Sequence, residues 1–428
     1  MIAVLMAGGK GTRISSVTKD IPKPMIRIGG KPVLEHQIET LKRQGITDFI
    51  ITVSHLGSVI MDYFGDGSGV SPATGKPFGV KIRYFNEKTP LGNAGALFYL
   101  EQYLTDDFLL LNGDLMFDFD LKRFLLFHRE SGGTVTLFAH PNSHPYDSGI
   151  IAADEHGLVR RWITKEDPKP EYYENLVNAG IHIVSPKIFP LVSARHTEYA
   201  GGPRIDLDRD LLKPLVQKEE VYAYRSPEYV RDMGTPERYQ EVCHDFANGI
   251  IQAKNLANRQ KAVFLDRDGT INRYIGFLRD PAQMELIPGA ADAINEIHKN
   301  GLLAIVVTNQ PVIARGEVTW EGLHNIHNRM EMLLGMEGAY LDDIFVCPHH
   351  PDKGFHGEVP ELKMICSCRK PKPGLLLAAA EKYNIDLSRS WMIGDSASDV
   401  SAGQAAGCRS IQLTEKKSLE QAVYTIMP

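Results

Sequence analysis

Two aspartates stand one residue apart where an apolar run ends in the last third of the chain. The run covers residues 263–265, and Asp266, Asp268 and Gly269 follow it. Alternate residues at a strand end point the same way, so both carboxylates can face one pocket. Carboxylates that close repel each other unless a cation lies between them. With Mg²⁺ present, one can attack phosphorus while the other handles the leaving-group proton. A β-turn capped by Asp and Gly is the alternative for this short pattern alone.

Three later loops carry groups that suit a phosphate site. They are Thr308 and Asn309 after the apolar run 302–307, Arg369 and Lys370 ahead of a helical stretch, and Asp395 and Asp399 after the run 391–393. The loops provide hydroxyl and amide donors, fixed positive charge and a second acidic strand end. Together with the aspartate pair, this order of loops predicts phosphoryl transfer rather than a turn.

Residues 261–415 resemble the haloacid dehalogenase superfamily of phosphotransferases. The resemblance implies that Asp266 is the nucleophile, which forms an aspartyl-phosphate, and that Asp268 is the general acid/base. Phosphate or substrate contacts are implied for Thr308, Asn309, Arg369 and Lys370. The implied Mg²⁺ ligands are the Asp266 carboxylate, the Asp268 backbone carbonyl and Asp395, with Asp399 in support.

A cluster of cysteines lies close to the lysine of this pattern. The potential metal ligands are Cys347, His349, Cys366 and Cys368, with His350 and His356 as alternatives for the histidine. Three thiolates and one imidazole complete a tetrahedral zinc site, and such a closed site is structural. Because Lys370 stands two residues after Cys368, the zinc would also position that lysine. Reduced, buried cysteines without a metal are the alternative.

The zinc loop narrows the resemblance to the D-glycero-D-manno-heptose 1,7-bisphosphate phosphatase branch. The motifs that carry it are Asp-Arg-Asp-Gly-Thr-Ile-Asn at 266–272 and Cys-Arg-Lys-Pro-Lys-Pro-Gly at 368–374. Histidinol-phosphate phosphatases share most of this pattern. Two positions depart from the family, since Pro311-Val312 stand where Ser-Gly is usual and Ser396 stands where Lys is usual. Both touch the expected phosphate pocket, so a histidinol phosphate or another sugar phosphate stays open as the substrate.

The N-terminal end carries a second set of phosphate-binding signals. A glycine-rich turn at 7–13 follows the apolar run 2–6, and such turns bring backbone N–H groups close to phosphates. Its spacing fits neither a P-loop nor the dinucleotide fingerprint, in which a third glycine would replace Ile14. Lys23 stands between two prolines that stiffen its loop. Asp114 and Asp232 offer two carboxylates for Mg²⁺.

Residues 1–240 resemble the sugar-1-phosphate nucleotidyltransferases. Nucleotide contacts are implied for Gly8, Gly9, Gly11, Thr12, Arg13, Gly92 and Asn93, and sugar contacts for Lys165, Glu166, Asn178 and Gly180. Lys23, with Arg13, would stabilise the charge on phosphorus, and Asp114 and Asp232 would hold Mg²⁺. Relatives that accept heptose 1-phosphate are guanylyltransferases, which implies GTP as the nucleoside triphosphate. The alternative is transfer to another sugar 1-phosphate.

These residues need parallel α/β sheets to bring them together. Buried strand patterns, at 2–6, 49–53, 108–111, 135–139, 262–265, 302–307 and 391–393, alternate with helical ones at 33–44 and 288–300. We expect an α/β chain with a Rossmann-like nucleotidyltransferase with a mixed sheet at 1–240, a helical linker at 241–260, and a haloacid dehalogenase-like domain with a zinc loop at 261–428.

The bulk composition agrees with a soluble two-domain enzyme that acts on small molecules. The chain has 428 residues, 43% hydrophobic residues and a formal net charge of −6. Nucleic-acid binders are usually basic, so we expect no nucleic-acid partner. No apolar run is long enough to span a bilayer, and the N-terminus lacks the features of a signal peptide. We therefore expect a cytoplasmic protein without a membrane partner, whose ligands are sugar phosphates and a nucleoside triphosphate.

Overall fold

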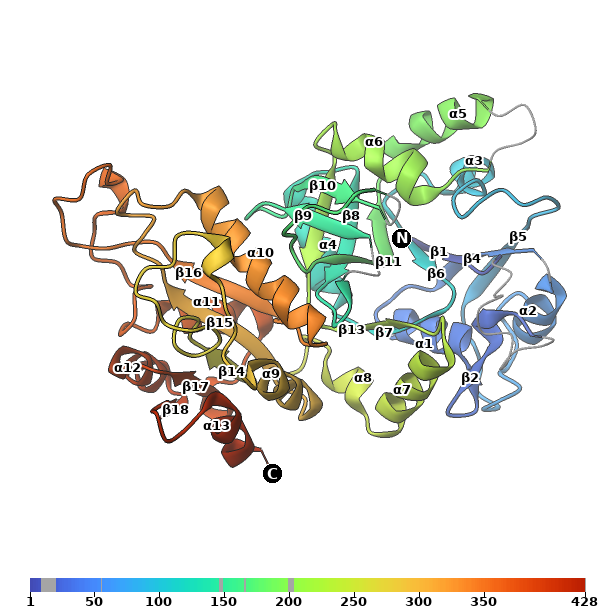
Figure 1. Ribbon diagram of the computed structural model, residues 1–428. Coiled ribbons are helices and arrows are strands. Elements are labelled where there is room, and N and C mark those ends of the chain that lie inside the picture. Colours follow the sequence, from blue (N-terminus) through green and yellow to red (C-terminus); the bar gives the residue numbers. More distant parts are fainter. Residues whose placement is uncertain (9–20, 55, 146–148, 165–166, 199–203, 428) are drawn as a thin grey trace. The chain divides into compact units, whose positions relative to one another are not determined.

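The chain folds into two compact units. The computed structural model describes residues 1–8, 21–54, 56–145, 149–164, 167–198 and 204–427 (Figure 1). The first unit contains residues 1–139, 151–164 and 178–255. The second contains residues 256–428 and two short segments from earlier in the chain, 140–150 and 165–177. Both units combine helices and sheets, so the α/β class predicted from the sequence is confirmed.

The first unit is built on a mixed sheet. Among the described residues its main strand order is β10-β9-β11-β6-β1-β4-β5, with β8 paired to β11 and β12 paired to β8. The bounds are β1 Ile2–Met6, β4 Asp48–Val53, β5 Lys81–Asn86, β6 Phe108–Asn112, β8 Val135–His140, β9 Ile150–Ala153, β10 Val159–Ile163, β11 Val177–Val184 and β12 Val221–Arg225. Strands β6, β1, β4 and β5 are parallel, whereas β11 runs antiparallel to β6. The parallel part brings the carboxyl ends of β1, β4 and β6 to one edge.

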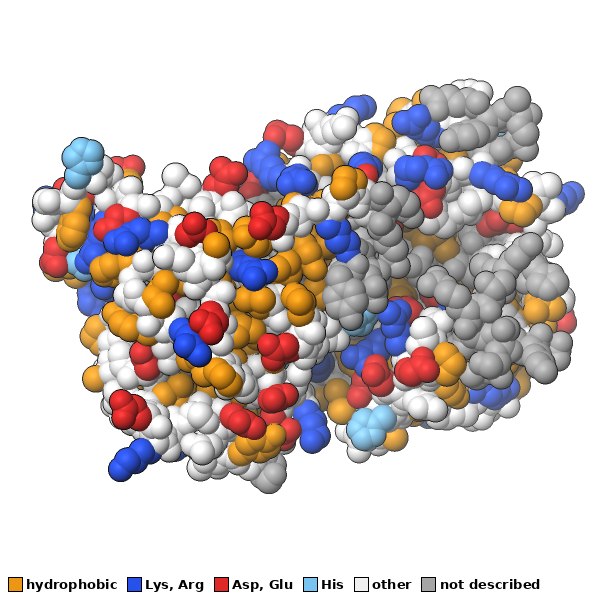
Figure 2. All heavy atoms as spheres, viewed as in Figure 1, with side chains coloured by type: hydrophobic (Ala, Val, Ile, Leu, Met, Phe, Trp, Pro, Cys, Tyr) orange, Lys and Arg blue, Asp and Glu red, His pale blue; other side chains and the backbone are white. Residues whose placement is uncertain are grey.

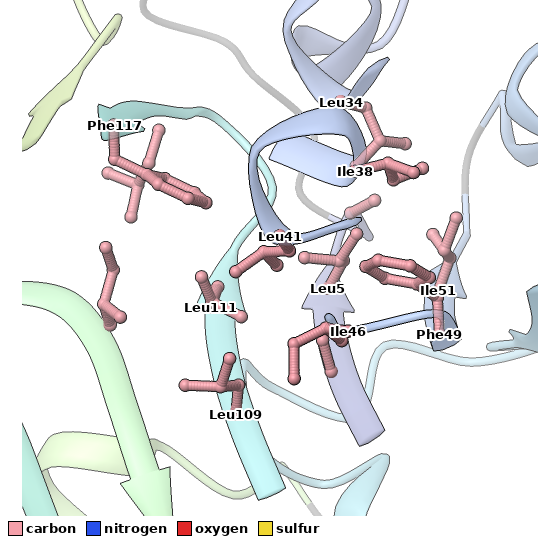
Figure 3. Packing of buried hydrophobic residues seen from close by; sticks show 14 of the residues in the cluster. Leu5, Leu34, Ile38, Leu41, Ile46, Phe49, Ile51, Leu109, Leu111 and Phe117 are labelled. Carbon is pink, nitrogen blue, oxygen red and sulfur yellow. The ribbon is translucent and has the colours of Figure 1, made fainter. Parts of the chain in front are cut away.

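Burial on both faces explains the apolar central strands of this sheet. Helix α1 (Val33–Arg43) covers one face, and Leu34, Ile38 and Leu41 come from it. They pack with Leu5 of β1 and Leu111 of β6 in the cluster drawn in Figure 3. Strands buried on both faces read as continuous apolar runs, which is why β1 and β6 were recognisable in the sequence.

A small ribbon and two helices end the first unit. Strand β7 (Leu115–Asp118) pairs antiparallel with β13 (Tyr229–Asp232). Helix α7 (Pro236–Ala247) begins after Thr235, whose side chain accepts a hydrogen bond from the backbone N–H of Arg238. Helix α8 (Ile250–Ala253) follows. Both helices bury apolar residues against this ribbon, among them Met116, Val242 and Ile251.

The second unit is a parallel sheet between two helical layers. Its order is β16-β15-β14-β17-β18, with β14 Ala262–Leu265, β15 Leu303–Asn309, β16 Asp343–Cys347, β17 Trp391–Gly394 and β18 Arg409–Gln412. The helices are α9 Ala290–Lys299, α10 Trp320–Met336, α11 Gly374–Tyr383, α12 Ala397–Ala406 and α13 Leu419–Ile426. Val263 and Leu265 of β14 pack with α9, α10 and α13, whereas Ala262 and Phe264 pack with α11 and α12. Alternate residues therefore fill two cores, and β14 lies in the centre of the sheet.

Surface charge and helix length agree with the composition. On the face drawn in Figure 2, acidic and basic side chains are interspersed. Among the described residues, no helix has the length and apolar character that crossing a bilayer requires.

Candidate active sites

The chain carries two candidate active sites, one in each unit. In the second unit the site is centred on Asp266, at the carboxyl end of the central strand β14. Leu265 pairs with Val306 of β15 on one side and with Ile393 of β17 on the other. The backbone N–H of Asp266 donates to the Ile393 carbonyl at 3.0 Å. Parallel pairing therefore brings the ends of three strands together at the sheet edge where ligands bind in open α/β folds.

Lys370 is buried against this carboxylate. Its side chain is 1% exposed, and its Nζ lies 2.8 Å from Asp266 Oδ1 and 2.6 Å from Asp399 Oδ1. Asn309 holds the lysine backbone from both sides, because its Oδ1 accepts from the Lys370 N–H and its Nδ2 donates to the Lys370 carbonyl, each at 3.1 Å. The phosphate contact predicted for Asn309 stays a prediction, and the structure adds that this side chain holds the backbone of Lys370.

Three carboxylates gather beside Lys370 and form a possible cation site. Oxygen atoms of Asp266, Asp395 and Asp399 all lie within 4.8 Å of one another. Burial raises the pKa of Asp266 to about 6, with Lys370 opposing the rise and Asp399 adding to it. Burial, with Asp399, also raises the pKa of Asp395. Since negative charges crowd here, and oxygen ligands are those that Mg²⁺ prefers, the donor set fits a divalent cation.

Gly269 is required by the close approach of Asp395. Its φ is +77°, and a Cβ there would lie 2.1 Å from Asp395 Oδ2. A side chain would therefore displace a carboxylate of the cation site, so the glycine after the aspartate pair serves the geometry of the site as well as the turn.

Asp268 takes a different position from the three clustered carboxylates. Its side chain pairs with Arg267, whose Nη2 lies 2.7 Å from Asp268 Oδ2. The expected acid/base residue is therefore held by its own neighbour in the sequence. Thr308, also predicted for the phosphate, is 1% exposed, and its Oγ1 accepts from Gln310 Nε2 at 2.9 Å.

Three cysteines and one histidine meet beside the loop that carries Lys370. Ligand atoms of Cys347, His349, Cys366 and Cys368 lie within 4.8 Å of one another. The sulfur–sulfur distances are 3.2 to 3.6 Å, and His349 Nδ1 lies 3.3 Å from Cys368 Sγ. All four side chains converge on one point with the donor set of a structural zinc site. His350, the alternative ligand, accepts from the backbone N–H of Asp352 at 3.2 Å instead.

Cationic side chains collect around His350 on the loops beside this cluster. The guanidinium of Arg315 lies 4.1 Å from the ring centre of Phe277 and 4.5 Å from that of Phe355. Lys363 is a buried residue whose Nζ lies 4.6 Å from the Phe355 ring centre and 3.5 Å from Glu358. Arg369 donates from Nη1 to the His349 carbonyl at 3.2 Å.

The group of side chains around His350 carries more positive than negative charge, since Arg315, Lys363 and Arg369 face Glu358 and Asp352. Burial and the charges of Arg369, Arg315 and Lys363 lower the pKa of His350, with Asp352 opposing them. Within the described part of the chain, Arg315 and Arg369 have no carboxylate within 4.0 Å. An anion bound beside them would supply the missing counter-charge.

The glycine-rich turn of the first site is described only at its start. Gly8 follows β1, and its carbonyl accepts from the hydroxyl of Ser54. A Cβ at Gly8 would lie 3.2 Å from Glu87 Oε1, so the chain passes close to this carboxylate. The other predicted nucleotide contacts of this turn, Gly9, Gly11, Thr12 and Arg13, lie outside the described residues.

Lys23 and Asp114 meet at the end of the parallel strands. Lys23 Nζ lies 3.1 Å from Asp114 Oδ2. Asp232 is tied to the same region, since it is paired with Leu115, the residue next to Asp114. Its carboxylate is bound by Arg238 at 2.7 Å. Among the described residues, neither aspartate belongs to a cluster of three potential metal ligands.

Two segments with predicted ligand contacts lie close to other parts of the chain: the loop with Gly92 and Asn93, predicted for the nucleotide, and β11 with Asn178 and Gly180, predicted for the sugar. Gly92 has φ +81°, and a Cβ there would lie 2.3 Å from the carbonyl of Ile205. Asn93 Oδ1 accepts from the Leu207 N–H at 2.6 Å, so this side chain fixes the loop. A Cβ on Gly180 would lie 2.3 Å from the Asn112 amide, two residues before Asp114. Asn178 Oδ1 accepts from the Gly180 N–H at 3.0 Å. Lys165 and Glu166 lie outside the described residues.

Sequence reasoning missed several residues of both sites. In the second site these are Arg267, Asn272 and Gln310, which contact Asp268. In the first site Glu87 lies against Gly8, and burial raises its pKa. The only signal for Arg267 was its place between two aspartates, and its burial could not be read from that.

Two family models match the chain. The nucleotidyl transferase model matches residues 2–269, which is more than half of the chain. A HAD-hydrolase-like model matches residues 367–424.

Curated relatives and solved structures match the two parts separately. The mannose-1-phosphate guanyltransferase of Pichia angusta is 30% identical over 255 residues, which are 58% of this chain and 63% of that protein. The chain thus spans less than two thirds of that relative. The D-glycero-beta-D-manno-heptose-1,7-bisphosphate 7-phosphatase of Escherichia coli (strain K12) is 42% identical over 151 residues, 35% of this chain and 77% of that protein. The structure of HddC from Yersinia pseudotuberculosis complexed with GMP-PN is 27% identical, with a TM-score of 0.46, over 57% of this chain and 99% of that chain.

Proposed function

We propose that this chain, which belongs to the nucleotidyl transferase family and ends in a HAD-type, heptose-bisphosphate phosphatase-like unit, catalyses two consecutive steps of nucleotide-activated heptose synthesis. The phosphatase removes the 7-phosphate of D-glycero-D-manno-heptose 1,7-bisphosphate. The transferase then joins GMP from GTP to the heptose 1-phosphate and releases pyrophosphate. We assign the transferase to residues 1–240 and the phosphatase to residues 261–428, with 241–260 as the helical linker.

The phosphatase reaction follows from the carboxylate and lysine at the end of β14. An Asp266 oxygen attacks phosphorus and forms an aspartyl-phosphate, while Asp268 protonates the departing sugar oxygen. Water then attacks the phosphorus, gives its proton to Asp268 and frees Asp266. Lys370, 2.8 Å from Asp266, and Thr308 hold the phosphoryl oxygens. Mg²⁺, held by Asp266, Asp395 and the Asp268 backbone carbonyl with Asp399 in support, would neutralise charge on the phosphoryl group.

The single observation that carries the substrate proposal is the cationic cluster of Arg315, Lys363 and Arg369. A bisphosphate brings a second dianion, which suits two guanidinium groups that lack a carboxylate partner among the described residues. Histidinol phosphate brings a cationic amine, which the same charges would repel. The relation to the Escherichia coli 7-phosphatase supports the same choice.

We propose zinc as the metal of the Cys347, His349, Cys366 and Cys368 cluster. Its four ligands leave no open position, so the metal would be structural. Because Arg369 and Lys370 follow Cys368 directly, the zinc would fix two cations of the phosphatase at once.

In the transferase reaction, the 1-phosphate of the sugar attacks the α-phosphorus of the nucleoside triphosphate. The nucleophile is already an anion, so positioning and charge neutralisation are sufficient without a base. Lys23, with Arg13, neutralises charge at the phosphorus, and Asp114 and Asp232 would hold Mg²⁺. The remaining nucleotide contacts stay as predicted at Gly8, Gly9, Gly11, Thr12, Gly92 and Asn93, and the sugar contacts at Lys165, Glu166, Asn178 and Gly180.

Guanine as the base rests on the relatives. The Pichia angusta relative is a mannose-1-phosphate guanyltransferase by name and is 30% identical over the transferase part. Mannose and D-glycero-D-manno-heptose share the ring configuration, so a site derived from one sugar 1-phosphate suits the other.

A phosphatase assay with a panel of esters tests the substrate. The full chain with Mg²⁺ is given the α and β anomers of heptose 1,7-bisphosphate, histidinol phosphate, and hexose monophosphates, and kcat/KM is measured for each. We expect one heptose bisphosphate anomer to be preferred at least about tenfold, since a second ionic contact contributes about 1.4 kcal/mol or more. Arg315→Gln should remove that preference while leaving hexose monophosphate hydrolysis unchanged. Preference for histidinol phosphate would contradict the proposal.

A further inference from the structure

The carboxylate of Asp268 is surrounded by hydrogen-bond donors from three residues. Arg267 donates to Oδ1 from Nε at 3.2 Å and from Nη2 at 2.9 Å, and Nη2 also lies 2.7 Å from Oδ2. Asn272 Nδ2 donates to Oδ1 at 3.0 Å, and Gln310 Nε2 donates to Oδ2 at 2.9 Å. Both carboxylate oxygens of Asp268, the proposed acid/base residue, are therefore held by protein side chains.

Arg267 itself is enclosed. Its side chain is 0% exposed, although guanidinium groups are rarely buried without a paired charge. Nη1 lies 3.2 Å from His327 Nε2, and Nη2 donates to Gln310 Oε1 at 3.1 Å. Burial and the Arg267 charge hold the pKa of His327 well below its ordinary value, so the imidazole is neutral and accepts from the arginine. Arg267 is thus held from two sides, by Gln310 directly after β15 and by His327 of helix α10.

We propose that Arg267, clamped by His327 and Gln310, is the positioning residue of the phosphatase, which fixes the Asp268 carboxyl where it exchanges a proton with the leaving oxygen. This inference rests on the acid/base role proposed for Asp268. The Arg267 guanidinium contacts Asp268, Gln310 and His327, so its side chain acts through Asp268 and takes no part in bond making. The Arg267 backbone N–H donates to Asp266 Oδ1 at 2.7 Å, a contact that a side-chain substitution leaves in place. A guanidinium is needed, because its planar fork reaches both Asp268 oxygens and Gln310 together.

The leaving group separates positioning from a general structural role. When Asp266 attacks phosphorus, the phosphorus–oxygen bond to the sugar breaks, and the alkoxide oxygen needs the Asp268 proton. A nitrophenolate departs without protonation, so forming the aspartyl-phosphate from p-nitrophenyl phosphate makes no demand on that proton. Hydrolysis of the aspartyl-phosphate uses Asp268 with either ester, so only the first step separates the two. Loss of positioning should therefore slow the first-turnover release of the sugar much more than that of nitrophenolate, whereas a loosened fold would slow both equally.

The experiment measures KM and the single-turnover rate of leaving-group release by the full chain, with enzyme in excess, for heptose 1,7-bisphosphate and p-nitrophenyl phosphate. Asp268→Asn is the reference, and we expect its release rate with the alkyl ester to fall on the order of 10²-fold or more. Arg267→Lys keeps the charge without the fork, and should lose about tenfold or more on the alkyl ester, with KM and the aryl rate within about twofold. The double variant should be no slower than Asp268→Asn, because the two residues act as a unit.

Two further variants distinguish loss of positioning from a general effect of substitution or misfolding. Arg273→Lys changes an exposed arginine that is four residues past Gly269 and paired with Glu285, and should leave both rates unchanged. If Arg267→Lys does not fold by its melting curve, Asn272→Ala removes one donor to Asp268 and should give the same selectivity at about threefold. Equal losses on both esters, or an additive double variant, would overturn the positioning role. An Asp268→Asn enzyme without selective loss would instead refute the acid/base role proposed above.

Discussion

The two active sites differ in what holds them together. In the phosphatase, charged side chains contact one another, with Lys370 between Asp266 and Asp399 and Arg267 around Asp268. In the described part of the transferase, Lys23–Asp114 and Arg238–Asp232 are separate ion pairs, and glycines at close approaches shape the chain between the predicted contacts. The proposed reactions account for this difference. Covalent attack by Asp266 would need side chains fixed against the phosphorus, whereas transfer by an already charged nucleophile would need backbone shape and positive charge.

The largest expected effect comes from removing the carboxylate that we propose as the phosphatase nucleophile. Asp266→Asn keeps the shape but cannot form the aspartyl-phosphate, so kcat for phosphate release should fall on the order of 10⁴-fold or more. GTP-dependent transfer to supplied heptose 1-phosphate should be unchanged. A coupled assay of phosphate and pyrophosphate measures both in one sample. Residual phosphatase activity near the wild-type value would refute covalent catalysis by Asp266.

Loss of Lys23 should lower the transferase rate, by a smaller factor than loss of Asp266 lowers the phosphatase rate. Lys23→Met removes the positive charge 3.1 Å from Asp114, and kcat for pyrophosphate release should fall about 10²- to 10³-fold. Phosphate release from the bisphosphate should not change. The exposed Lys76→Met is the matched control and should leave both rates alone. If Lys23→Met and Lys76→Met changed the transferase rate equally, the proposed role of Lys23 in the reaction would be refuted.

Backbone geometry should matter in the phosphatase also. Gly269→Ala puts a Cβ at a left-handed φ and 2.1 Å from Asp395 Oδ2. A carboxylate displaced by about 1 Å should cost about 10²-fold in kcat and raise the Mg²⁺ concentration needed for half activity. Gly276→Ala, in the same loop and with no atom within 4 Å of its Cβ, is the control for the strained φ alone. Identical losses in the two variants would assign the effect to φ rather than to Asp395.

Metal removal tests whether the cysteine cluster is structural. Cys368→Ser, or a zinc chelator, should lower the unfolding temperature of the phosphatase by about 10 °C, corresponding to roughly 3 kcal/mol for a domain of this size. Transferase activity below that temperature should stay constant. Cys408→Ser, a buried cysteine outside the cluster, is the control. Zinc content measured by atomic absorption must fall with stability in the first variant only.

The smallest expected effect concerns the partner of Asp232. Arg238→Gln removes the guanidinium 2.7 Å from that carboxylate, which frees it for a cation. The half-saturating Mg²⁺ concentration of the transferase should fall by no more than about fivefold, because a partly exposed ion pair contributes at most about 1 kcal/mol. If Arg238→Gln left the Mg²⁺ dependence unchanged, the proposal that Asp232 binds Mg²⁺ would be contradicted.

Strands and the residues at their ends were predictable from the sequence, and contacts between loops were not. Asp266, Thr308 and Asp395 follow apolar runs buried on both faces, so a one-dimensional pattern located them at one sheet edge. Asn309 was predicted at the phosphate, which stays a prediction, and its contact with the Lys370 backbone, 61 residues away in sequence, was not foreseen. That pairing depends on how two loops pack, which local propensity does not encode.

The transferase shows the same limit. The nucleotide contact predicted for Asn93 stays a prediction, and the hydrogen bond that its Oδ1 accepts from the Leu207 N–H was not foreseen. Glycine positions carried more information, because Gly92 and Gly180 stand where another chain segment leaves no room for a Cβ. Motif spacing therefore predicted where the chain passes close to itself, while the partners of each polar side chain required the structure.

One time course tests the two-step account most directly. The full chain, Mg²⁺, GTP and heptose 1,7-bisphosphate are combined, and phosphate, pyrophosphate and the sugar product are followed by mass spectrometry and ³¹P NMR. We predict a transient of heptose 1-phosphate, followed by GDP-heptose, with one phosphate and one pyrophosphate released per product molecule. Accumulation of heptose 1-phosphate without pyrophosphate, or a nucleotide sugar that still carries the 7-phosphate, would contradict the account.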